Sequence, residues 1–216
     1  MKKVLFIFTV SSHFFVFSQK TIQFSDPLPS GKATQITTDK KFFENYKSNQ
    51  SNVTYVIDET GISIQTLMVA SVSRKQLRES SQLQYRNNYL FGIKENDSVP
   101  CVLEGENYYY GIVSKLPITC DSSSNKLTQI SPNSYIINFH EGAYFEPSLL
   151  QFTATGLEII HSELKYQPFF SKFLQVATIT RYGSEVAILT PTFEQFEQLK
   201  KELFIGEKLI YLKENN

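Results

Sequence analysis

The side chains best suited to chemistry in this sequence of 216 residues are two histidines with carboxylates nearby. His140 precedes Glu146, and His161 lies between Glu158 and Glu163. Two imidazoles and a carboxylate can bind zinc or form a hydrolytic site if separate strands bring them together. The spacing matches no helical metal motif such as H-E-x-x-H. His140, Glu146 and His161 are therefore weak candidates for a metal or hydrolytic site, and we expect them to lie scattered at strand ends.

The two cysteines, Cys101 and Cys120, are the next candidates. An even number of cysteines in an exported chain favours a disulfide, and closing this loop would stabilise the fold by roughly 3 kcal/mol. Two buried free thiols are the alternative. A bridged Cys101 cannot act as a nucleophile with His140, and the chain has no G-x-S-x-G nucleophile elbow. We therefore predict a Cys101–Cys120 disulfide, no catalytic residue and no cofactor.

Three consecutive tyrosines, Tyr108, Tyr109 and Tyr110, are candidates for a binding face that would contact an envelope protein or a glycan. Strands also use tyrosine for ordinary cross-strand packing, which is the alternative interpretation. The chain contains no tryptophan, the residue that most often stacks on sugars.

Alternating apolar residues separated by turn residues predict the elements that would position these side chains. Strand pairs of this kind predict hairpins over 53–66, 101–113, 127–139, 149–160 and 175–189, with further strands over 89–94 and 209–212. Such closely spaced strands predict an antiparallel sheet, sandwich or partly closed barrel built of hairpins.

Two helices are predicted from capping residues and apolar spacing. Ser73 and Gln76 have the spacing of a capping box, which predicts a short helix. A C-terminal amphipathic helix is expected over 191–204, with Thr190 as its cap and Pro191 at its first position. The fold class is therefore mainly β (α+β), with this helix covering one face of the sheet and one or two short helices elsewhere.

The first eighteen residues have the pattern of a signal peptide. Lys2 and Lys3 precede a short apolar region that ends at Ser18, which predicts cleavage before Gln19. An apolar stretch of about fourteen helical residues spans only about 21 Å, short of the roughly 30 Å of a bilayer core. No later run of eighteen apolar residues occurs, so we expect no transmembrane segment after the leader and a single domain over 19–216.

The charge of the expected mature chain is close to neutral. Removing Lys2 and Lys3 from 21 basic residues leaves 19 against 21 acidic residues. A net charge near −2 gives no electrostatic basis for binding nucleic acid or an anionic membrane surface. We therefore expect no nucleic-acid partner.

The leader ending in Phe17-Ser18-Gln19 and the segment from Glu95 to Gly111 resemble uncharacterised exported proteins of flavobacterium-type bacteria (Bacteroidetes). The second segment covers about a tenth of the chain, and the group brings no known activity. The C-terminal residues 209–216 lack a clear match to the sorting domain of the group's secretion pathway. The resemblance therefore implies export, to the periplasm rather than the cell surface.

Three functional hypotheses follow from the sequence. The favoured one is an exported, non-catalytic envelope or periplasmic protein that binds or supports a partner, because β-turns on a stable scaffold can display contact residues. The second is a β-barrel that binds a small apolar ligand. The third is a hydrolase whose site is assembled from separate strands.

Overall fold

The computed structural model describes residues 20–94 and 97–214, so the predicted signal peptide and its cleavage site lie outside the described residues. The described chain is mainly β, as predicted. Its helices are α1 (Arg74–Glu79) and α2 (Phe193–Leu203), with two 3-10 turns at Lys40–Phe42 and Pro168–Lys172. The strands are β1 (Thr21–Phe24), β2 (Glu44–Ser48), β3 (Val53–Asp58), β4 (Gly61–Ser73), β5 (Gln84–Arg86), β6 (Tyr89–Lys94), β7 (Asp97–Glu104), β8 (Asn107–Thr119), β9 (Lys126–Ser131), β10 (Ser134–Glu141), β11 (Tyr144–Phe152), β12 (Gly156–His161), β13 (Leu174–Arg181), β14 (Ser184–Thr190) and β15 (Lys208–Lys213).

The strands form one open sheet. Its order is β13-β14-β1-β11-β12-β15-β2-β3-β4-β8-β7-β6-β5, with β10 and β9 extending from β11. Among the described strands, β1 and β14 run parallel and the other paired strands run antiparallel. Of the antiparallel sheet, sandwich or partly closed barrel that were expected, the structure has a sheet, which is open and mixed rather than wholly antiparallel. The five predicted hairpins are all present as consecutive antiparallel strands.

The body of the molecule contains two apolar cores, one on each face of β10 and β11. The sheet curls around the first core, so that strands β2 to β4 face strands β9 to β12 across it. At its centre, the rings of Phe42 and Phe152 stack with centroids 3.9 Å apart. The second core fills the space between β10, β11, β1 and β14 and the apolar face of α2.

The C-terminal helix packs on the sheet as predicted, but it begins two residues later. Thr192, rather than Thr190, is its cap: the Thr192 hydroxyl accepts a hydrogen bond from the Gln195 N–H, and the Gln195 side chain accepts one from the Thr192 N–H. This reciprocal capping box satisfies two otherwise unpaired groups, which explains why the helix starts at Phe193. The buried residues of α2 are Phe196, Leu199 and Leu203.

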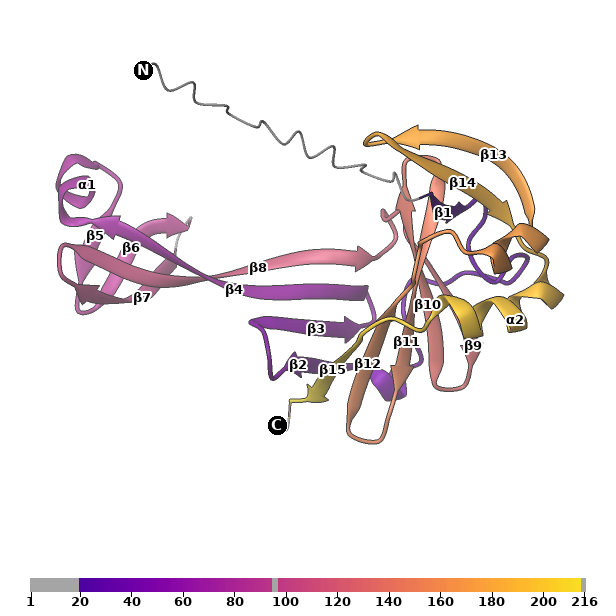
Figure 1. Cartoon of the computed structure of the whole chain (residues 1–216). Helices are drawn as coiled ribbons and strands as arrows, with labels where there is room; N and C mark the ends of the chain where they lie inside the picture. Colours follow the sequence, from indigo (N-terminus) through magenta and orange to yellow (C-terminus); the bar gives the residue numbers. More distant parts are fainter. Residues whose placement is uncertain (1–19, 95–96, 215–216) are drawn as a thin grey trace, which may run out of the picture.

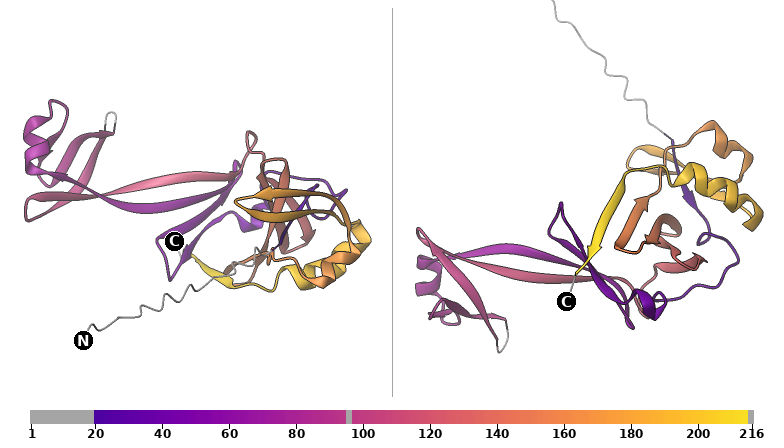
Figure 2. Two further views of the ribbon diagram at one scale, coloured as in Figure 1. Left: turned by 45° about the horizontal axis from the view of Figure 1, so that its top comes forward. Right: turned by 90° about the horizontal axis from the view of Figure 1, so that it is seen from below.

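The most unusual feature is a long β-arm that projects from the body. Figures 1 and 2 show β4 and β8 leaving the body together as a ribbon, with α1, β5, β6 and β7 at its far end. We call residues 67–71 and 109–113 the shaft and residues 72–108 the tip; together they form the arm. Each long strand has 13 residues, so the predicted strands 62–66 and 108–113 were too short.

Candidate functional site

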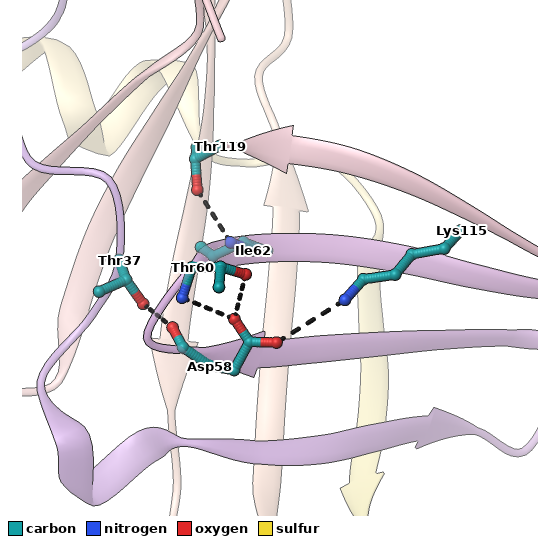
Figure 3. A network of polar contacts seen from close by, with 6 residues as sticks. All are labelled: Thr37, Asp58, Thr60, Ile62, Lys115 and Thr119. Carbon is teal, nitrogen blue, oxygen red and sulfur yellow. Dashed lines mark hydrogen bonds and ion pairs between the residues drawn. The ribbon is translucent and has the colours of Figure 1, made fainter. Parts of the chain in front are cut away.

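The root of the arm, where β4 and β8 meet the body, is held by side chains that bind backbone groups. The Thr119 hydroxyl accepts a hydrogen bond from the Ile62 N–H at 3.1 Å (Figure 3). It also donates one to the Ile36 carbonyl at 2.6 Å. One threonine thus ties both strands of the arm to the segment before β2. Because both Thr119 and Ile62 are buried, these bonds are shielded from water, and an unpaired group here would be costly.

The turn between β3 and β4 adds a second set of contacts at the root. The Asp58 carboxylate accepts hydrogen bonds from the N–H of Thr60 at 2.8 Å and from its hydroxyl at 2.5 Å, and Lys115 of β8 lies 3.7 Å away (Figure 3). The Thr37 hydroxyl donates to the Asp58 carbonyl at 2.6 Å. Contacts from the segment before β2, from the turn between β3 and β4, and from β8 therefore fix the direction in which the arm leaves the body.

We expect the Asp58 contacts to stabilise the fold at neutral pH and to fail in acid. Hydrogen bonds from the Thr60 side chain and backbone, together with the charge of Lys115, hold the Asp58 pKa below its usual value. The unfolded carboxyl has a pKa of about 3.9, so the stabilisation is complete above that pH and is lost as the pH falls through the lower folded pKa. Denaturation of wild type and Asp58→Asn should show a stability difference at pH 7 that shrinks below about pH 4. A constant difference would contradict this role.

The shaft is a two-stranded ribbon, and its pairing assigns each residue to one of two faces. Residues directly opposite each other in an antiparallel pair point to the same face, and neighbours along a strand point to opposite faces. Leu67 pairs with Val113 and Val69 pairs with Gly111, which places these residues on one face. The intervening positions of both strands lie on the other face.

The first of these faces carries a continuous apolar stripe that runs from the shaft onto the tip. The pairing of Tyr109 with Val102, and of β7 with β6, extends the same face across two more strands. Each large apolar side chain on this face is between 37 and 72% exposed. We call these residues the stripe: Leu67, Val69, Tyr89, Phe91, Val102, Tyr109 and Val113.

Polar residues bound the stripe at both ends. At the root end, Gln65 and Lys115 pair on the same face, and at the tip end the face carries Arg86 and Glu104. No charged residue occurs within 66–73 or 108–114, the two segments that form the shaft and its junction with the tip. An apolar centre with a polar rim is the arrangement found at protein–protein contacts.

The opposite face of the tip is covered by its own small core. Val72, Leu90, Val99, Cys101 and Tyr108 are buried together, and partly buried residues that include Leu77 of α1 pack against them. Ser73 caps α1 with Gln76 in the predicted capping box. The tip is therefore a folded unit with one covered face and one bare face, and the bare face carries the stripe.

The three consecutive tyrosines are divided between the two faces. Tyr108 is buried in the tip core, where its ring lies 4.7 Å from that of Tyr85, and Tyr110 packs against the same core. Of the three, only Tyr109 belongs to the stripe. Because side chains alternate along a strand, Tyr109 points to the face opposite Tyr108 and Tyr110, and the three tyrosines do not share one face.

The candidate metal or hydrolytic residues are not brought together. His140 pairs with Phe145 and Glu146 with Phe139 across β10 and β11, so His140 and Glu146 point to opposite faces. The His161 Nδ1 lies 3.0 Å from the hydroxyl of Ser148, but that serine is buried. In the described part of the chain, no carboxylate contacts the His161 ring. Ser148 and His161 therefore lack the carboxylate that orients the histidine in a catalytic triad.

Glu146 instead lies at a shallow cavity in the body. Its carboxylate accepts a hydrogen bond of 2.5 Å from the buried Gln23 amide. The cavity has a volume of about 460 Å³ and is also lined by the Glu141–Arg181 ion pair, whose atoms lie 2.7 Å apart. Within residues 20–94 and 97–214, no group of three or more histidine, cysteine or acidic side chains is arranged to hold a metal ion.

The predicted disulfide is wrong, because Cys101 and Cys120 are free and lie at opposite ends of the arm. Cys101 of the tip pairs with Tyr110 of the shaft, whereas Cys120 follows the last residue of β8 at the root. Ten residues of strand separate Tyr110 from Cys120, a distance of roughly 33 Å, and a disulfide needs Cα atoms within about 7 Å. Burial raises the pKa of the Cys101 thiol, as expected for a packed cysteine.

Comparisons with known proteins found no matching family model, no similar curated protein and no similar solved structure. Among the described residues, no helix is long and apolar enough to cross a bilayer. The arm and its stripe must therefore be interpreted from their own chemistry. Of the stripe residues, Tyr109 alone was identified from the sequence. The absence of charged residues over 66–73 is the sequence signal that could have indicated the rest.

Proposed function

We propose that this protein is an exported, non-catalytic binding protein whose arm presents the stripe to a protein partner in the cell envelope. The observation that carries the proposal is the stripe itself. Contiguous apolar patches of several large side chains are uncommon on proteins that have no partner, and they mark interaction sites. The leader-like first eighteen residues support export, with the periplasm as the favoured compartment.

The chemistry of the stripe favours a protein over a glycan, a nucleic acid or an anionic lipid. Its centre offers branched aliphatic side chains and Tyr109, with no charge to attract phosphate. Sugars need hydrogen-bonding side chains beside an aromatic platform, and the shaft has few of these. Apolar side chains with a polar rim match the exposed apolar surface of another protein.

The geometry of the arm also suits binding. The root fixes the direction of the arm, and the shaft separates the tip from the body (Figures 1 and 2). The stripe side chains are exposed, so a partner can reach them. A two-stranded ribbon alone is marginally stable in water. Covering the stripe with a partner would bury its apolar groups and stabilise the shaft.

The proposal predicts that charge on the stripe abolishes capture of the partner. The double variant Val69→Lys/Val102→Lys places two ammonium groups in the apolar centre and should reduce capture of envelope proteins by immobilised protein more than tenfold. Val176→Lys is the control, because Val176 is also an exposed strand valine but lies on β13 of the body. Each variant is first checked for wild-type stability. Equal capture by the double variant and wild type would contradict the proposal.

A further inference from the structure

Among the described residues, the outer edge of β4 in the shaft has backbone groups without hydrogen-bond partners. The N–H of Leu67 donates to the Asn52 carbonyl at 3.4 Å, and the N–H of Ser73 donates to the Gln76 side chain at 2.8 Å. Alternation places the N–H and C=O groups of Val69 and Ser71 on the same outer side. Within the described chain no strand pairs with this side, because β3 ends its pairing at Thr66.

This edge also lacks the features that usually prevent strands from pairing between molecules. Exposed edges are commonly protected by lysine, proline, bulges or charge. The free edge of β8 carries Lys115 and Pro117, and Pro117 has no N–H to offer. Segment 66–73 of β4 contains no charge and no proline, and the register shift between β4 and β8 lies outside it, at Ile62 and Ser63.

We propose that the edge of β4 pairs antiparallel with the same edge of a second copy of this chain, around a two-fold axis beside Ala70. In this register Val69 lies opposite the partner's Ser71, and Ser71 lies opposite the partner's Val69. Each of these residue pairs exchanges two backbone hydrogen bonds. The resulting four bonds use every unpaired outward group of Val69 and Ser71. This inference rests on the proposed function, because it identifies one protein that the arm binds.

The side chains of the segment are compatible with pairing to themselves. Around a two-fold axis each residue lies near its own copy in the partner. A charged residue in this segment would therefore lie near a charge of the same sign. Segment 66–73 has none. Met68, which is half exposed, would lie opposite the partner's Val72, whose side chain is buried in the tip core. Pairing converts a two-stranded ribbon into a four-stranded sheet, which is the more stable arrangement.

The size of the contact predicts how strongly the copies associate. Stable protein interfaces bury about 1,200 to 2,000 Å² in total, and an edge of about six residues lies at or below the low end. We therefore expect a reversible dimer whose fraction rises with protein concentration. Sedimentation velocity over a concentration series of the mature chain measures this directly.

Ser71→Pro is the variant that tests the edge. Proline removes the outward N–H of Ser71 without removing a bond to β8, and proline is tolerated at such edge positions. Two of the four hydrogen bonds disappear, which should weaken the dimer by about tenfold or more. Ser71→Thr keeps the N–H and should dimerise like wild type. Circular dichroism confirms that both variants are folded.

Cross-linking tests the register. Ala70 and the partner's Ala70 form a non-hydrogen-bonded pair, whose Cα atoms lie about 4.5 Å apart, within the range for a disulfide. In a Cys120→Ser background, Ala70→Cys should form a covalent dimer under mild oxidation, and Ser114→Cys on β8 should not. A chain that stays monomeric at all concentrations, or equal cross-linking of both variants, would overturn the proposal. Such a chain could still capture an envelope protein through the stripe, so this failure is distinct from failure of the proposed function.

Discussion

Replacing Gly61 with alanine is expected to lower the free energy of unfolding by about 3 to 5 kcal/mol. Gly61 has a φ of +135°, a conformation that side-chain-bearing residues rarely adopt. A Cβ atom at this position would lie 1.8 Å from the Thr119 carbonyl oxygen and 3.3 Å from that of Ile36. Both contacts are with backbone, so relief requires the root of the arm to move and its hydrogen bonds to break.

Gly105→Ala provides the matched control for Gly61→Ala. Gly105 also has a positive φ, +59°, but a Cβ atom there would meet no atom within 4 Å. Its replacement should cost only about 1 kcal/mol, the usual penalty for this backbone conformation. Urea denaturation of the two variants separates the steric clash at the root from the conformational cost. Equal losses of stability would show that the packing around Gly61 does not hold the root.

The second large effect is expected in the tip. Leu90 is fully buried in the tip core, which contains few other buried residues. Leu90→Ala removes buried methyl groups and leaves a cavity, a change that costs about 2 to 5 kcal/mol. Because the tip core is separate from the two body cores, we expect the tip to open locally while the body stays folded.

Hydrogen exchange followed by mass spectrometry distinguishes local from global opening. In Leu90→Ala, amides of β6 and β7 should exchange faster than in wild type, and those of β10 and β11 should not change. Leu103→Ala is the control, because Leu103 also lies on β7 but is 40% exposed and outside the buried tip core. Faster exchange throughout the body would mean that the tip and body unfold as one unit.

Local sequence patterns predicted the hairpins well, because the information needed lies within each hairpin. Alternating apolar residues around Thr60-Gly61 and Thr155-Gly156 were enough to identify β3 with β4 and β11 with β12. The capping box of Ser73 and Gln76 is likewise a local signal. The cap of α2 was misplaced because Thr190 and Thr192 are both suitable caps, and only the partner at Gln195 decides between them.

Relations between distant elements could not be predicted in the same way. The disulfide prediction rested on the even number of cysteines, which carries no information about distance. The predicted strand ended at Val113, whereas β8 continues to Thr119 and carries Cys120 away from Cys101. Which face each histidine occupies depends on the register of β10, β11 and β12, which turn residues alone do not define. The stripe assembles side chains from four strands, so no single segment reveals it.

The most direct test of the account compares two neighbouring residues of β7. Val102 belongs to the stripe, whereas Leu103 points to the opposite face, and both side chains are exposed. A photoreactive amino acid placed at each position in turn, in the full chain expressed in its native host, reports what each face contacts. The account predicts cross-linking to a protein from position 102 and little from position 103. Equal cross-linking at both positions, or none from position 102, would contradict it.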